Sequence, residues 1–123
     1  MVLLRELLGN HDLAFKGMAV SGDPFITVVG GFRVYKGRRV SGSPIYTISG
    51  NKLFKGMTTA GRPLAVLSGD LVFLDIKLIG SPIARLSKTR SFKGVATAGS
   101  PIVTVPSGNT ATLFAATYHA LRG

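Results

Sequence analysis

The sequence predicts an all-β fold in which five β-hairpin repeats of about 19 residues form an antiparallel meander. A proline recurs at intervals of 20, 19, 19 and 19 residues, each with a glycine two positions before it. An aromatic residue stands nine positions before each proline, and Lys-Gly follows it in four of the five copies. The prolines are Pro24, Pro44, Pro63, Pro82 and Pro101, and the aromatics are Phe15, Tyr35, Phe54, Phe73 and Phe92. A fixed period indicates one supersecondary unit copied along the chain.

The run after each proline is predicted to be a strand. Phe25–Val29, Ile45–Ile48 and Ile102–Val105 are short, apolar and rich in β-branched residues, which is typical of strands rather than helices. Each run ends in residues that favour tight turns, because glycine, asparagine and aspartate tolerate positive φ. The predicted hairpin turns are Gly30-Gly31, Ser49–Asn51, Ser68–Asp70, Ser87–Thr89 and Ser107–Asn109.

The strand after each turn is predicted to carry the aromatic residue. In Leu71–Ile79, apolar Val72, Leu74, Ile76 and Leu78 alternate with other residues at a period of two. The strand then ends at Gly-x-Pro, where proline removes a backbone donor at a position that tolerates its loss. Two strands per copy give about ten strands in all.

The charge pattern favours a meander over a β-solenoid. In a solenoid, Lys16, Lys36, Lys55 and Lys93 would stack about 4.8 Å apart, and each adjacent pair would cost up to about 1 kcal/mol even in water. A meander separates them by two strands, or roughly 10 Å, near the Debye length. Closure removes exposed strand edges, so we expect a closed barrel or a curled sheet. A β-solenoid and an interdigitated trimeric β-structure are the alternatives.

The two ends of the chain differ from the repeats. Residues 2–9 place four leucines on one helical face, which predicts a short N-terminal helix or cap. The repeats cover 13–109, and alanine-rich 110–122 is predicted to be a C-terminal helix or a strand that caps the array. We therefore expect one domain over 1–123. The first nine residues are too short and too charged for a secretory signal, so we expect no export by a cleaved one.

The net charge of +10 predicts an anionic partner, because only five acidic residues offset 15 basic ones. The candidate contacts are Arg33, Lys36, Arg38, Arg39, Lys55, Arg85, Lys88, Arg90 and Lys93. The repeated aromatics could stack on bases beside these cations, but a residue that recurs once per copy is better explained as core. The expected surface therefore binds polyanions with strong salt dependence and little sequence preference.

The residues that could perform catalysis or bind metal are few. The chain has no cysteine, and His11 and His119 would meet only if the ends of the array meet. Two histidines without a carboxylate cluster make a poor metal set, and no serine has a nucleophile-elbow context. The repeated Gly-x4-Gly is never followed by Lys-Ser or Lys-Thr, so these are interpreted as turn glycines rather than a phosphate-binding loop. We expect no enzymatic activity, no cofactor and no metal.

Three segments resemble the strand units of PAAR-repeat proteins, which form the tips of phage tail spikes and related secretion machines. They are Ser41–Asn51, Gly80–Arg85 and Gly99–Val105, each built around Gly-Ser-Pro-Ile. The histidine and cysteine metal cluster of that family has no counterpart here. The resemblance implies a non-enzymatic structural protein of a virion, such as a tail spike, baseplate or capsid decoration component. It also implies other virion proteins and copies of itself as partners, and assembly in the host cytoplasm. The alternative is a cytoplasmic polyanion-binding module for nucleic acid or acidic glycan.

Overall fold

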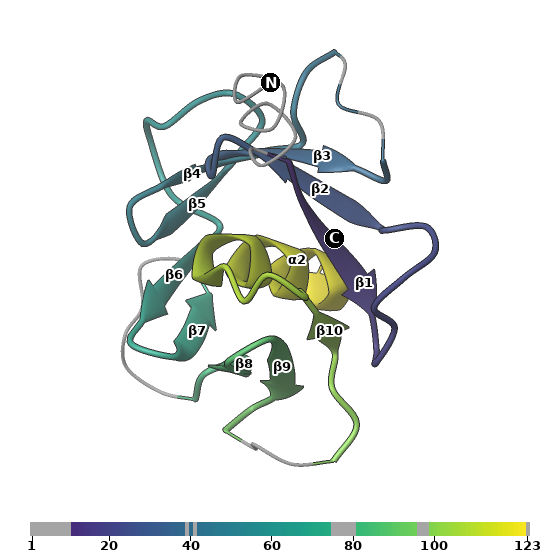
Figure 1. Cartoon of the computed structure of the whole chain (residues 1–123). Helices are drawn as coiled ribbons and strands as arrows, with labels where there is room; N and C mark the ends of the chain where they lie inside the picture. The colour runs from purple at the N-terminus through teal and green to yellow at the C-terminus, as the bar shows by residue number, and fades with distance from the viewer. Residues whose placement is uncertain (1–10, 39, 41, 75–80, 96–98, 123) are drawn as a thin grey trace.

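The computed structural model describes residues 11–38, 40, 42–74, 81–95 and 99–122 as a closed antiparallel barrel around one helix (Figure 1). Each strand pairs with its neighbours in sequence, and the first pairs with the last. The strands are β1 (His11–Lys16), β2 (Ile26–Val29), β3 (Arg33–Lys36), β4 (Tyr46–Ser49), β5 (Lys52–Lys55), β6 (Ala65–Ser68), β7 (Leu71–Leu74), β8 (Ala84–Ser87), β9 (Arg90–Lys93) and β10 (Val103–Thr104). The helix is α2 (Thr110–Arg122). The predicted all-β meander and its closure are confirmed. The solenoid alternative is wrong, and one chain closes the barrel without the strands of a trimer.

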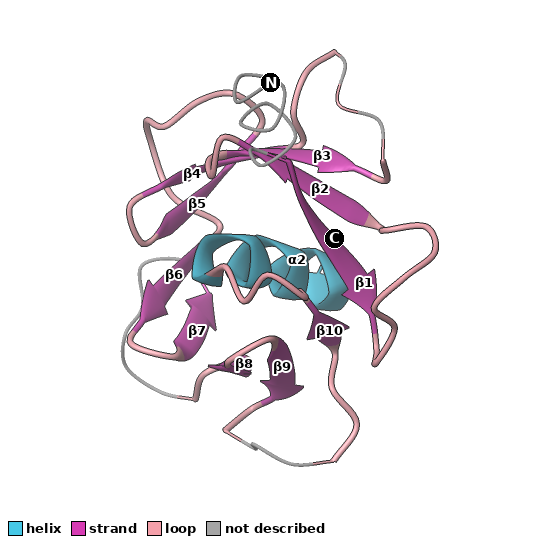
Figure 2. Ribbon diagram, viewed as in Figure 1, coloured by secondary structure: helices cyan, strands magenta, loops and turns pink. Residues whose placement is uncertain are grey.

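Four tight turns join β2–β3, β4–β5, β6–β7 and β8–β9, as predicted (Figure 2). Gly50 and Gly69 open two of them with φ of 62° and 64°. Lys88 takes the equivalent place in the β8–β9 turn with φ of 58°, a conformation that costs energy in a residue with a side chain. The fifth predicted turn, at 107–109, is not a hairpin turn, because β10 leads there into the helix. The fifth strand pair is instead β10 with β1, from opposite ends of the described chain.

Longer connections link the hairpins, and four of them have a glycine at positive φ near each end. Gly17, Gly37, Gly56 and Gly94 follow the strand lysines with φ of 62–71°. The glycines two positions before proline have φ of 79–100° in the four copies that the structure describes. Only glycine adopts these angles without strain, so the interpretation of the Gly-x4-Gly repeat as turn glycines is confirmed.

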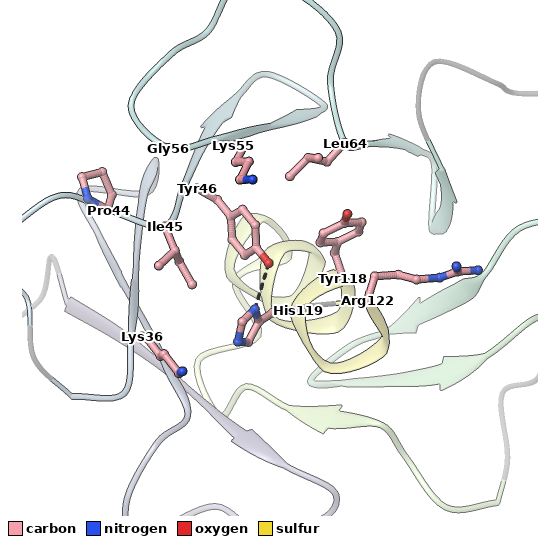
Figure 3. A pocket seen from close by; sticks show the side chains of 10 residues that line it. All are labelled: Lys36, Pro44, Ile45, Tyr46, Lys55, Gly56, Leu64, Tyr118, His119 and Arg122. Carbon is pink, nitrogen blue, oxygen red and sulfur yellow. Dashed lines mark hydrogen bonds between the residues drawn. The ribbon is translucent and has the colours of Figure 1, made fainter.

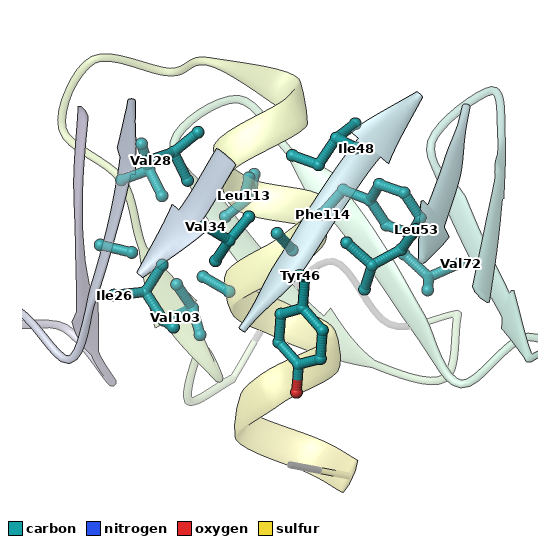
Figure 4. Close-up of a cluster of buried hydrophobic side chains, with 14 of the residues drawn as sticks. Ile26, Val28, Val34, Tyr46, Ile48, Leu53, Val72, Val103, Leu113 and Phe114 are labelled. Atoms are coloured by element: carbon teal, nitrogen blue, oxygen red, sulfur yellow. The ribbon is translucent and has the colours of Figure 1, made fainter. Parts of the chain in front are cut away.

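The barrel interior is filled by side chains from alternate strand positions and by α2 (Figure 4). A barrel of eight strands is just wide enough for side chains alone to fill it. Ten strands leave more space, which the helix occupies. Leu113 and Phe114 are 1% exposed, and Ala115 and Ala116 are fully buried between the strands. Of the two alternatives predicted for 110–122, the structure has the helix and not the strand, and the helix forms part of the core instead of capping the array.

The repeated aromatics form a second buried layer on the outside of the barrel. Phe15, Tyr35, Phe54, Phe73 and Phe92 are only 5–8% exposed, yet they are not part of the interior cluster. Successive residues of a strand point to opposite faces of the sheet. In four of the five copies the residue before the aromatic belongs to the interior cluster, so the aromatic rings at this repeat position point outward. Three of these aromatics pair across the sheet with a threonine that also points outward. The hydroxyl of each threonine donates a hydrogen bond to the backbone carbonyl of the glycine at the start of a connection. These bonds run from Oγ1 of Thr27, Thr47 and Thr104 to the carbonyls of Gly37, Gly56 and Gly17, at 2.6–2.7 Å. The connections are thereby fastened against the outer layer. The rings are buried as predicted and are not available to stack on bases.

The direction of α2 is set at its N-terminus. Asn109 Oδ1 accepts a hydrogen bond from the Thr112 backbone amide at 3.1 Å, which makes Asn109 the N-cap. Asp12 from β1 accepts hydrogen bonds from the Thr112 and Ser107 hydroxyls at 2.8 and 2.9 Å. A carboxylate at this position also complements the positive end of the helix dipole. The N-terminus of α2 therefore lies at the barrel end that carries the hairpin turns.

Three sequence-based predictions fall on residues outside the described ranges: the helix over 2–9, the end of the strand over 75–79, and Arg39. Within the described residues, β1 begins at His11, two residues before the predicted start of the repeats. No helix among the described residues is long and apolar enough to span a membrane.

Candidate functional site

The barrel end at the C-terminus of α2, here called the mouth, carries a hollow of about 590 Å³ (Figure 3). Its lining combines apolar side chains with cations from three elements. The residues are Lys36, Pro44, Ile45, Tyr46, Lys55, Gly56, Leu64, Tyr118, His119 and Arg122. Two smaller hollows adjoin it, one sharing Lys36 and His119 and the other sharing Arg122. Together the three hollows surround the last turn of the helix.

The repeat places a lysine at the mouth in four of its five copies. Lys16, Lys36, Lys55 and Lys93, here called the mouth lysines, end β1, β3, β5 and β9. These strands all run from the turn end towards the mouth, because every second strand of a meander has the same direction. All four side chains are exposed, and each of the four lines at least one of the three hollows.

Aromatic contacts connect the mouth lysines to the helix end. Lys16 Nζ lies 5.6 Å from the centre of the Phe25 ring, and that ring stacks on His119 at 6.1 Å. His119 Nδ1 and Tyr46 Oη form a hydrogen bond of 2.8 Å, drawn as a dashed line in Figure 3. Tyr46 also meets Tyr118 edge to face at 5.7 Å. These contacts hold the rings in fixed positions beside the cations.

The electrostatics of this pair follow from burial and from the surrounding positive charge. Burial lowers the pKa of His119 below 6.5, and the nearby charges of Lys36 and Lys16 lower it further. Burial, with a smaller contribution from Tyr118, raises the pKa of Tyr46 to about 12. At neutral pH both groups are therefore uncharged. In the tautomer that has its proton on Nε2, Tyr46 donates the hydrogen bond to His119.

Positive charge at the mouth exceeds what the fold uses. The C-terminus of a helix carries about −0.5 of an elementary charge, which favours cations within the last turn. The mouth lysines and Arg122 present five positive charges to it. Among the described residues, the lining of the three hollows includes no carboxylate. This balance of charge makes the mouth the candidate anion-binding surface of the described residues.

The structure divides the predicted basic contacts between different places. Lys36, Lys55 and Lys93 come together at the mouth. Arg33, Lys88 and Arg90 lie at the turn end, where Arg33 stands 5.0 Å from the centre of the Phe32 ring. Arg38 lies on a connection and donates a hydrogen bond to the Gly22 carbonyl. Arg85 forms an ion pair with Asp70 at 3.0 Å and donates to the Val95 carbonyl.

The ends of the array meet, since β1 pairs with β10, but the two histidines do not. His11 pairs with Val29 at the turn end, whereas His119 lines the mouth. His11 and Lys16 are the two ends of β1, about 17 Å apart at the rise of an extended strand. The described residues contain no group of three or more potential metal ligands.

The site also contains residues that sequence reasoning did not select: Lys16, Tyr46, Tyr118 and Arg122. Lys16 shares the Lys-Gly signal of the other mouth lysines and could have been chosen with them. Tyr118 and Arg122 carried no signal without the position of the helix. No protein-family model, curated protein or solved structure matches the chain. The resemblance to PAAR-repeat proteins therefore stays an expectation.

Proposed function

We propose that this chain is a non-enzymatic module that binds polyanions through the mouth of its barrel. The observation that carries the proposal is the position of the mouth lysines and Arg122 around the end of α2, where the described lining of the hollows includes no opposing carboxylate.

The β6–β7 hairpin supports the view that the lysines serve binding rather than folding. Leu74 occupies the position that lysine takes in the other copies, and it pairs with Ala65 across β6. The same register joins Lys55 to Tyr46 and Lys93 to Ala84. The hairpin therefore forms equally with leucine or lysine at this position, so strand pairing does not require the cation.

The experiment compares two variants with equal loss of charge. The mouth variant is Lys16→Gln, Lys36→Gln, Lys55→Gln and Lys93→Gln. The control carries Arg33→Gln, Lys52→Gln, Lys88→Gln and Arg90→Gln at the turn end. Binding of duplex DNA and of heparin is measured at several salt concentrations. We expect the wild type to lose DNA binding by about 0.3 M salt. The mouth variant should bind at least tenfold more weakly, with a DNA salt slope reduced by up to about 0.9 per cation removed. Equal losses in both variants would refute a mouth-specific site.

A second candidate, a structural component of a virion, is favoured by apolar residues on the connections. Met18, Met57 and Val95 follow the Lys-Gly glycines in three copies and are 63%, 63% and 59% exposed. Repeated exposed apolar side chains suit contact with another protein. The closed barrel has no free strand edge among its described strands, so assembly would use the connections. Measurement of size in solution tests this, and a monomer for both the wild type and Met18→Ser with Met57→Ser would count against it.

A further inference from the structure

The main hollow at the mouth has a lining with two chemical characters. Ile45, Leu64 and Tyr118 are partly buried and pack against the interior core, so they present apolar surface beside the helix end. Lys36, Lys55 and Arg122 are exposed cations that line the same hollow. A volume of about 590 Å³ falls in the range of small-molecule sites, roughly 300–1,000 Å³.

We propose that this hollow binds a small amphipathic anion with a flat apolar body and one sulfonate, carboxylate or phosphate group. The inference rests on the proposed function, because it uses cations of the same site, and it adds a ligand of defined shape. A polyanion held by charge alone needs only exposed cations. Ile45, Leu64 and the Tyr118 ring would then have no part in recognition, whereas an amphipathic ligand uses both halves of the lining.

The apolar half suits a flat body because its aromatic rings are held in place. Tyr46 is 7% exposed, hydrogen bonds to His119, and meets Tyr118 at an interplanar angle of 85°. Tyr118 is only half-buried, so part of its ring remains open to the hollow. Aromatic groups pair favourably in offset-stacked or edge-to-face arrangements. A planar ligand can therefore pack against Tyr118 without moving the core.

The polar half suits a single anionic group. Lys36 comes from β3, Lys55 from β5 and Arg122 from α2, so three separate elements bring their charges to one hollow (Figure 3). A guanidinium can donate two parallel hydrogen bonds to a carboxylate, sulfonate or phosphate, and a lysine adds a compact charge. A separate hollow, distinct from the three at the mouth, is lined by Phe32, Arg33 and six other residues; it contains one cation and serves as an internal comparison.

The experiment uses naphthalene-2-sulfonate as the probe and titration calorimetry of the full chain at low salt. We expect saturable binding of one molecule per chain. Inorganic sulfate and naphthalene-2-methanol should not bind at the same concentrations, since each provides only half of the recognition. Absence of binding, or equal binding of sulfate, would overturn the inference.

Variants assign the bound probe to this hollow. Tyr118→Ser should weaken naphthalene-2-sulfonate binding by roughly five- to tenfold, the loss expected for one aromatic contact with its buried area. Leu64 lies directly before β6, far from α2 in the sequence. Leu64→Ser should also weaken probe binding, and it replaces Tyr118→Ser in the experiment if the latter lowers the melting temperature too far. Phe32→Ser is the matched control and should bind like the wild type. Probe binding unchanged by both Tyr118→Ser and Leu64→Ser would refute the site.

Single lysine variants separate this inference from the proposed function. Lys93→Gln should weaken duplex DNA binding and leave probe binding unchanged, because Lys93 lines a neighbouring hollow and not the main one, whereas Lys55→Gln should weaken both DNA and probe binding. Probe binding at the hollow without DNA binding would refute the polyanion function and keep the small-ligand site. DNA binding that depends on the mouth lysines, without probe binding, would keep the function and refute the inference.

Discussion

The internal helix makes a strong prediction about stability, because Phe114 fills the barrel from inside. Its side chain is 1% exposed within the interior cluster, so Phe114→Ala removes a ring and leaves a cavity. Truncations of this kind cost about 3–5 kcal/mol. Phe32→Ala is the matched control: this ring is 43% exposed, and its remaining burial is worth about 1 kcal/mol. We expect the two variants to differ by about 2–4 kcal/mol in the free energy of unfolding.

Urea denaturation followed by circular dichroism measures both free energies, provided the slope with denaturant stays constant. A domain of this size has about 5–15 kcal/mol of stability, so Phe114→Ala should still fold in part or in full. Phe114→Leu keeps most of the apolar volume and should lose less than about 1.5 kcal/mol, which gives a graded series. Equal costs for Phe114→Ala and Phe32→Ala would refute the placement of α2 inside the barrel.

Three further predictions concern single groups. The Thr117 hydroxyl is buried and has no hydrogen-bond partner among the residues that the structure describes. Thr117→Val should therefore raise the free energy of unfolding by about 1 kcal/mol in urea denaturation, and a decrease would contradict this. Lys88 has positive φ at a position where two other turns have glycine. Lys88→Gly should therefore raise the melting temperature, with a gain of up to about 1 kcal/mol in the free energy of unfolding. An unchanged or lower melting temperature would count against strain in this turn. Burial and the charges of Lys36 and Lys16 lower the pKa of His119 in the folded state, so the unfolded state binds more protons at this group. The stability that comes from neutral His119 is therefore fully present above pH 6.5, and it is lost as the pH falls through the pKa of the folded state. Titration by NMR should give His119 a pKa below 6.5 that rises in Lys16→Gln with Lys36→Gln, and a value of 6.5 or above in the wild type would contradict the burial argument.

The fold was predictable from sequence as far as local patterns specify it. The proline and glycine spacing predicts the hairpins, and the separation of like charges predicts the meander. The depth of the aromatic residues was harder to predict, because period two says only that Phe54 and Leu53 face opposite sides. Both are buried, since Leu53 contributes to the interior and Phe54 belongs to the outer layer. A sheet whose inner face packs against α2 and whose outer face is covered by the connections gives no contrast in polarity between the two faces.

The place of the helix was not predictable from its composition alone. Thr112 to Thr117 are six consecutive buried residues, so α2 has no polar face over this stretch. Such a helix must be surrounded, but a sequence of alanine, threonine and leucine is equally compatible with a strand. Only the width of a ten-stranded barrel creates the space that the helix fills.

The candidate site depends on the direction of that helix, and charge explains the direction. The mouth lysines end β1, β3, β5 and β9, so they lie at one end of the barrel whatever the helix does. Asp12, near the start of β1, lies at the other end and binds Thr112. A reversed helix would place its positive N-terminus among the lysines and its negative C-terminus beside Asp12. Each such interaction is worth about 0.3–1 kcal/mol, and all of them would change sign. The charges that make the mouth the candidate anion site therefore also favour the orientation that brings Tyr118, His119 and Arg122 to it.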